Sequence, residues 1–321
     1  MRTAPELLAL RDDPGLQREA QRALFARMEV WRRDARIAPV FDELERYARR
    51  GAIGECPHLS ALFDPASGAA EAFLATLFET AAAALAANPL AHIPFRHFCD
   101  DALATLQLAR CDNAMLVIEA IDGDRFAKLK HAENVEFKPA EVFERVVAGS
   151  ATGELIRCEN VEADRADLET SGIALGAGRV LQLEARRDAV VLRAVEGRLV
   201  TLRLLRREPA ARPAREFRIA DGMLAHQAAG SVLESRVEMM MALLGRMNWQ
   251  QAAPVMARIA QGTGPRSLRW QAVRECLALD TATGFATLTV IAQSAEDDLA
   301  PAAGALRSQL IETYPQLREV A

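Results

Sequence analysis

Hydrophobic residues alternate with polar ones in the middle of the chain, and they recur every three or four residues on either side. The clearest alternation lies within 179–206, where three short segments each place their apolar residues on one face: Leu181–Ala185, Val190–Ala194 and Val200–Leu204. The dipeptides Arg187-Asp188 and Glu196-Gly197 separate these segments and are suited to hairpin turns. The pattern predicts a β-meander that lies between two helical regions.

Residues 1–90 have the helical period. Leu24, Met28 and Trp31 belong to one apolar stripe, and similar stripes follow within 41–48 and 70–85. The segment 69–87 is the most apolar of these, but it contains two glutamates and consists mostly of alanine. We therefore expect a buried helix here rather than a membrane span.

From about residue 102 the period changes to that of short strands. Nine or ten β-prone segments follow, with breaks at Asp112-Asn113, Thr152-Gly153 and Ser171-Gly172. Parallel βαβ units are not expected, because no helix-length pattern separates consecutive strands. The rhythm favours an antiparallel β-sandwich or barrel of jelly-roll type, resembling the cupin fold, over residues 91–230.

The helical period returns over 231–321. Leu233, Met240 and Met241 lie on one stripe, so we expect both methionines to pack in a core. The segment Leu268–Leu277 and the residues after it resemble HEAT-type helical repeats over roughly the last 70 residues. The resemblance implies stacked helical pairs that offer a protein-binding surface. The predicted class is thus α+β, with N-terminal helices (1–90), a central sheet domain (91–230) and a C-terminal HEAT-like bundle (231–321).

Composition limits the partners. The 321 residues carry a net charge of −5, with a pI of about 5.7, which gives no general electrostatic reason to bind nucleic acid or an anionic membrane. The five cysteines are scattered and form no CxxC pair, which favours a reducing, cytoplasmic location with the cysteines as small core residues. The apolar run at the N-terminus is too short to predict a signal peptide.

One set of residues is compatible with a metal site: His131, Glu133 and the distant His226. Two histidines and one carboxylate on a jelly roll are the ligands of mononuclear non-heme iron. The set resembles that of the 2-oxoglutarate-dependent dioxygenases, and the resemblance implies that Arg236 binds the cosubstrate carboxylate, with iron and 2-oxoglutarate as cofactors. Two features depart from the family: a glutamate replaces its aspartate, and Arg236 lies in a helical pattern. The alternative is three unrelated surface residues.

The histidine pair of the metal-binding cupins is absent, so we expect a cupin-like sheet here to hold no metal. The mouth of such a barrel still offers a place for a small molecule.

An arginine-rich segment follows the meander, and only Glu208 and Glu216 oppose its positive charge. The candidate partner-binding residues are Arg203, Arg206, Arg207, Arg212 and Arg215. They could contact nucleic acid or an acidic partner. The favoured alternative is a solvated, unpaired loop between two strands, because few aromatic residues are interleaved to stack on bases.

The sequence therefore favours a non-enzymatic, cofactor-free regulatory or scaffold protein. Its expected partner is a small molecule or another protein, with no membrane contact, and a homodimer remains open. The first alternative is the iron dioxygenase, and the second is a nucleic-acid-binding regulator that uses the arginine-rich segment. The main prediction rests on the lack of a convincing set of catalytic residues in the sequence.

Overall fold

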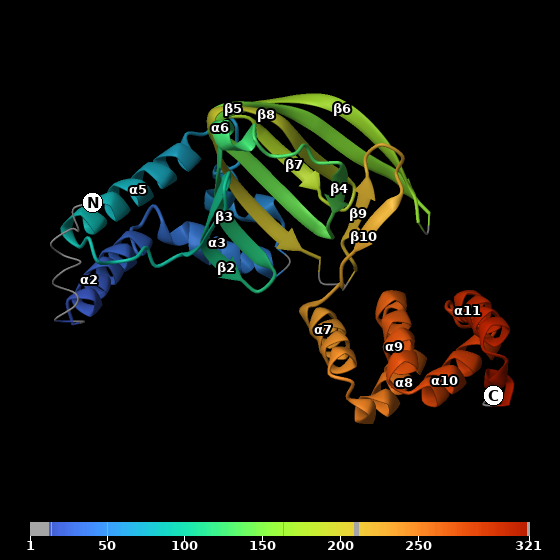
Figure 1. Cartoon of the computed structure of the whole chain (residues 1–321). Helices are drawn as coiled ribbons and strands as arrows, with labels where there is room; N and C mark the ends of the chain where they lie inside the picture. The colour runs from blue at the N-terminus through green and yellow to red at the C-terminus, as the bar shows by residue number, and fades with distance from the viewer. Residues whose placement is uncertain (1–12, 14, 50, 163, 209–211, 320–321) are drawn as a thin grey trace. The chain divides into compact units, whose positions relative to one another are not determined.

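The computed structural model describes residues 13, 15–49, 51–162, 164–208 and 212–319 (Figure 1). The chain forms two compact units, the first of Met1–Ala210 with Arg215–His226 and the second of Ala211–Ala214 with Gln227–Ala321. The sequence predicted three parts, whereas the N-terminal helices and the sheet lie in one unit. The reason is physical: side chains from both pack into a single hydrophobic core.

Within the described part of the first unit, the helices that precede the sheet are α2 (Gly15–Arg32), α3 (Ala38–Ala48), α4 (Pro57–Ala61) and α5 (Ala69–Ala87), with a short 3₁₀ turn, η1 (Ile53–Glu55), before α4. The predicted stripe of α2 is confirmed, since Leu24, Met28 and Trp31 are buried. Trp31 packs against Phe41 and Phe73, with ring centroids 5.8 and 5.5 Å away. These aromatic contacts join α2, α3 and α5 into one layer.

Helix α5 is the one helix among the described residues that is long and apolar enough, by length and composition, to cross a membrane. Its side chains Ala70, Phe73, Leu74 and Leu77 are buried in the core that the helices share with the sheet. One face of the helix is therefore buried, whereas only 33% of its apolar segment is buried as a whole.

The main sheet has seven strands in the order β1-β2-β3-β8-β5-β6, and β7 also pairs with β5 (Figure 1). The strands are β1 (Arg96–Cys99), β2 (Leu103–Cys111), β3 (Ala114–Asp122), β5 (Ala140–Val161), β6 (Ala166–Gly176), β7 (Val180–Glu184) and β8 (Asp188–Arg207); the short helix α6 (Gly123–Phe126) follows β3. A second sheet has the order β10-β9-β4, with β4 (Asn134–Phe137), β9 (Arg215–Arg218) and β10 (Leu224–Gln227). Every pairing among these strands is antiparallel, as predicted.

Strands β5 and β8 are much longer than the sequence predicted. The expected turn at Glu196-Gly197 lies inside β8, and the expected break at Thr152-Gly153 lies inside β5. The register between the two strands shifts at these places, which marks β-bulges. Gly149 and Gly197 have φ angles of +83° and +64°, so they bend the strands without ending them.

The two faces of the main sheet have different environments. Because side chains directly opposite each other in an antiparallel pair share a face, Leu116, Leu204 and Phe143 all lie on the face that packs against the helices. The residues next to them in sequence, among them Val117, Glu119 and Arg203, lie on the other face, which we call the helix-free face.

The second unit is helical, with α7 (Val232–Arg246), α8 (Ala253–Gln261), α9 (Arg266–Leu279), α10 (Thr281–Gln293) and α11 (Ala300–Thr313), and the 3₁₀ turns η2 (Gln250–Ala252) and η3 (Pro315–Glu319). Helix α9 packs against α7, α8 and α10. The prediction that Met240 and Met241 share a core is only half right: Met241 is 3% exposed and Met240 is 57% exposed. The α7 stripe is turned so that Met241 faces α9, which leaves Leu233 and Met240 at the surface.

Candidate functional site

Three charged side chains lie together at the centre of the helix-free face. Glu119 on β3, Arg203 on β8 and Glu144 on β5 come from adjacent strands, with Arg203 directly opposite Glu144 in the register. Arg203 Nη1 donates a hydrogen bond to Glu119 Oε2 at 2.8 Å, and Arg203 Nε lies 3.1 Å from Glu144 Oε2. We call these three residues the Glu–Arg–Glu cluster. It holds two negative charges and one positive charge.

The carboxylate of Glu144 contacts Arg203 without an aligned hydrogen bond. Its side chain is 14% exposed, and its oxygens are not among the buried atoms that lack a hydrogen-bond partner, so solvent reaches them. The nearby Arg203 Nε is itself buried without a hydrogen-bond partner, because its N–H is not aligned with the carboxylate. Burial raises the pKa of Glu144, and the charge of Glu119 raises it further, while Arg203 opposes both.

Apolar side chains surround the cluster on the same face. Val142 and Val146 flank Glu144 along β5, Leu181 lies opposite it on β7, and Leu205 lies next to Arg203 on β8. Val117 on β3 lies directly opposite Arg203 and is half-buried. The face therefore combines a charged centre with an apolar border, in which Val142, Val146 and Leu181 are themselves buried.

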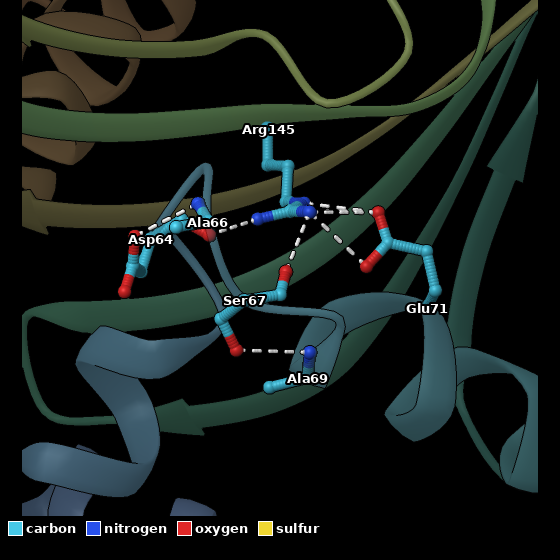
Figure 2. Close-up of polar contacts among 6 residues, drawn as sticks. All are labelled: Asp64, Ala66, Ser67, Ala69, Glu71 and Arg145. Carbon is cyan, nitrogen blue, oxygen red and sulfur yellow. Dashed lines mark hydrogen bonds and ion pairs between the residues drawn. The ribbon is translucent and has the colours of Figure 1, made fainter.

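Arg145 is the neighbour of Glu144 in sequence and points to the opposite face, toward the helices. Figure 2 shows its guanidinium against the carboxylate of Glu71 on α5, with contacts at 2.9 to 3.1 Å. It also donates to the backbone carbonyls of Asp64 and Ser67. Because all three of its nitrogens are hydrogen-bonded, Arg145 fixes the helices to the sheet.

The arginine-rich segment is not the solvated loop that the sequence favoured. Arg203 and Arg206 lie within strand β8, and both form ion pairs. Arg206 contacts Glu141 at 2.8 Å, donates to the carbonyls of Tyr47 and Gly51, and stacks over the Tyr47 ring. These two arginines are internal because β8 extends farther than its pattern indicated.

The other three arginines of this segment differ in their exposure. Arg207 and Arg212 are exposed, and Arg215 is half-buried on β9. The five residues therefore do not form one continuous basic surface, since two of them are used inside the first unit. This arrangement disfavours the nucleic-acid hypothesis.

The proposed iron ligands are not brought together. His131 and Glu133 are exposed in the segment before β4, and His226 is exposed on β10. No group of three or more histidine, cysteine, aspartate or glutamate side chains that could hold a metal ion occurs in the part of the chain that the structure describes. The structure does not favour the iron-site hypothesis, because one-residue spacing in sequence does not direct two side chains to a common point when the segment is an exposed loop.

Arg236, the proposed cosubstrate ligand, lies on α7 in the second unit rather than on a strand. Ser231 and Glu234 form a capping box that starts this helix: Ser231 Oγ accepts from the Glu234 backbone N–H, and the Glu234 carboxylate accepts from the Ser231 N–H. The local sequence therefore determines a helix at this position.

A depression lies where β5 and β7 end and β8 begins. Its volume is about 400 Å³, and it is lined by charged side chains that include Arg157, Arg187 and Asp188. These side chains pair with acidic partners, Arg157 with Asp188 at 3.0 Å and Arg187 with Glu159 at 3.3 Å. The pairs are largely solvated, so this depression is a weaker candidate than the helix-free face.

Sequence reasoning did not single out Glu119 or Glu144. A signal was present, since each lies in an apolar alternating segment with hydrophobic residues two positions before and after it: Val117 and Ile121, or Val142 and Val146. A charge at an inward-facing strand position needs a partner or a function. Which charges meet there was not readable, because it depends on strand pairing.

No protein-family model matches the sequence, and no curated protein matches it. Three solved structures similar to part of the chain are CapF with the inhibitor 3-isopropenyl-tropolone, ectoine synthase from P. lautus, and the Drosophila melanogaster CENP-C cupin domain. Their identities are 11%, 13% and 11%, and their TM-scores are 0.26, 0.24 and 0.27. The matches cover 36%, 34% and 36% of this chain, and 31%, 67% and 77% of those chains.

The chain thus spans about a third of the CapF chain. One of the three is a cupin domain by name. The assignment to the α+β class rests on the helices and antiparallel sheets described above. Fold and site together define an α+β protein that carries a charged cluster on one face of its main sheet.

Proposed function

We propose that the protein is a non-enzymatic binding protein whose small-molecule ligand occupies the helix-free face of the main sheet. The observation that carries this proposal is the Glu–Arg–Glu cluster at the centre of an apolar border. A charged group that has been moved away from water without full hydrogen bonding is unfavourable, and a bound ligand relieves that cost.

A binding role is favoured over catalysis by the chemistry of the cluster. Both carboxylates contact the same guanidinium, and none of the three side chains is a serine, cysteine, histidine or lysine. The part of the chain that the structure describes also offers no three-ligand metal group for the iron dioxygenase alternative. The ion pairs of Arg203 and Arg206 likewise disfavour the nucleic-acid alternative.

The experiment is a ligand-observed NMR screen with a library of small fragments. Val117→Trp places a large side chain on the helix-free face beside Arg203, and Val30→Trp is its matched control on the exposed surface of α2. We expect fragments that bind the natural protein to be lost in Val117→Trp and kept in Val30→Trp, with both variants folded by circular dichroism. Fragments that bind Val117→Trp as well as the natural protein would contradict the proposal.

We further propose that the second unit binds another protein, in line with the HEAT-type resemblance. Support comes from α7, which exposes Leu233, Met239, Met240 and Leu243, each by more than half of its surface. Flexible methionines at a surface suit contact with another protein. Sedimentation of the natural protein and of Leu243→Glu tests the simplest form of this role, a homodimer, which the charged substitution should dissociate.

We also propose that the protein is cytoplasmic and carries no cofactor. The five cysteines are free thiols, which suits a reducing compartment. Metal analysis of the purified protein tests the cofactor part, and stoichiometric iron would contradict it.

A further inference from the structure

Strand β6 forms one edge of the main sheet and pairs with β5 on one side only. At its start, the Ala166 N–H donates to the Gly222 carbonyl, in the turn between β9 and β10. From Asp167 to Leu175, no described strand pairs with the other side of β6. Most of this 11-residue strand therefore offers its outer backbone groups to a further strand.

The register of β5 and β6 shows which backbone groups point outward. Cys158 on β5 donates its N–H to the Arg187 carbonyl, on the β8 side, and therefore away from Leu168, its partner on β6. Hydrogen-bonded and non-hydrogen-bonded pairs alternate along an antiparallel ladder, and the register after Leu168 has no shift. The central residues that direct their N–H and C=O groups away from β5 are thus Thr170, Gly172 and Ala174.

The usual protections of an edge strand are missing from this part of β6. The strand contains no lysine and no proline, and no bulge interrupts its pairing between Leu168 and Gly176. Gly172, at the middle of the outward-facing groups, is exposed, and none of the described atoms lies within 4 Å of a Cβ built on it. A glycine in a strand interior often marks a place where another backbone approaches closely.

The distribution of charge on β6 favours a second copy of the same strand, running antiparallel, as the partner. Both acidic residues, Asp167 and Glu169, lie in the first half of the strand, and the second half is uncharged. About a two-fold axis at Gly172, Glu169 lies opposite Leu175 of the second copy, so no like charges meet. A parallel, in-register pair would instead place each carboxylate beside its own copy, which is unfavourable.

We propose that two copies of the chain associate by antiparallel pairing of their β6 strands about a two-fold axis at Gly172, which joins their main sheets into one. The outward groups of Gly172 bond to those of its copy, and Thr170 pairs with Ala174 of the second copy. This contact is separate from the α7 contact and does not depend on the ligand proposed for the helix-free face.

Gly172→Cys tests the contact directly. The Cα atoms of a hydrogen-bonded antiparallel pair lie about 5.5 Å apart, a separation that a disulfide spans. Under mild oxidation the full-length variant should form a covalent dimer on a non-reducing gel. Gly68→Cys is the matched control, since Gly68 is also exposed with open space around a Cβ, and it should form no more dimer than the natural protein. Equal cross-linking of the two variants would overturn the inference.

Two pairs of substitutions in the Gly172→Cys protein test the register. Thr170→Lys with Ala174→Lys places like charges opposite each other across the axis and should remove most of the cross-link. Thr170→Lys with Ala174→Glu places opposite charges there and should keep it. Both positions are exposed, so both proteins should fold, which circular dichroism checks. Equal cross-linking of the two proteins would overturn the proposed pairing.

Discussion

Arg145 and Arg203 show how two arginines on neighbouring strands of one sheet acquire different roles. Arg145 is 3% exposed, and all of its nitrogens are hydrogen-bonded to Glu71 and to backbone carbonyls. Arg203 contacts two carboxylates but leaves its buried Nε unpaired. A fully paired charge holds a structure together, and an incompletely paired one marks a place where something else can bind.

The raised pKa of Glu144 leads to a prediction for stability. Burial makes the folded state bind the proton of the Glu144 carboxyl more tightly than the unfolded state does. The protonated side chain therefore stabilises the fold at low pH, and this stabilisation is lost as the pH rises from the ordinary glutamate pKa through the higher pKa of the folded state. Glu144→Gln should therefore increase the free energy of unfolding at neutral pH, by on the order of 1 kcal/mol, with no gain below about pH 4.

Urea unfolding of both proteins at several pH values measures this difference. Glu45→Gln removes a charge from an exposed ion pair of α3. This control variant should show no such pH-dependent gain. A Glu144→Gln variant that is less stable than the natural protein at neutral pH would mean that its pairing with Arg203 outweighs its burial.

The cysteines give a second prediction at this scale. Cys56, Cys158 and Cys276 are buried, and burial raises the pKa of each thiol, that of Cys276 to about 11. Cys99 is exposed on β1. A thiol reagent at neutral pH should therefore modify Cys99 first and the three buried thiols only on unfolding, and mass spectrometry of the labelled peptides measures the order.

At the scale of elements, two glycines explain why β5 and β8 continue past their expected ends. Gly149 and Gly197 both adopt positive φ angles, which residues with a side chain adopt only at a cost. They differ in space, since a Cβ on Gly149 would collide with the carbonyl oxygen of Arg198, whereas none of the described atoms lies close to a Cβ on Gly197. The bulges bend the paired strands while most of the ladder between them is kept.

This difference makes a matched pair of variants. Gly197→Ala should lower the free energy of unfolding by about 1 kcal/mol, the cost of the backbone conformation alone. Gly149→Ala should lower it by clearly more, because the β8 backbone must also move. Thermal unfolding of the two variants measures both effects, and equal losses would show that the Arg198 carbonyl moves aside freely.

At the scale of the whole molecule, each unit has hydrophobic cores of its own. The first unit contains three clusters of buried residues, and the second contains one that is centred on α9 and α10. We expect the two units to unfold as separate cooperative transitions.

Arg145→Ala tests this expectation together with the link between helices and sheet. Removing this buried guanidinium leaves the Glu71 carboxylate and two carbonyls without their donor, which should cost the first unit about 3 to 5 kcal/mol. Arg157→Ala removes an arginine that is half exposed and should cost under about 1 kcal/mol. Scanning calorimetry should show one transition moving to lower temperature and the other unchanged; a common shift would mean that the units unfold together.

Much of the architecture was predictable from the period of the apolar residues. The α2 stripe of Leu24, Met28 and Trp31, the hairpin at Asp112-Asn113 and the antiparallel strands all follow from local patterns. Such patterns express which side of an element is buried, and burial is decided residue by residue along a helix or strand. The same reasoning wrongly predicted a turn at Gly197, because a glycine suits a bulge as well as a turn.

The sequence alone determined the class of fold, the helical ends and the strand-rich middle, because these depend on short-range periodicity. Only the tertiary structure decided which charges meet. Glu119, Glu144 and Arg203 are separated by 25 and 59 residues, and they lie together because β8 pairs with both β3 and β5. Strand pairing is a long-range choice that the pattern of a single strand does not encode, so the candidate site becomes visible only once the sheet is formed.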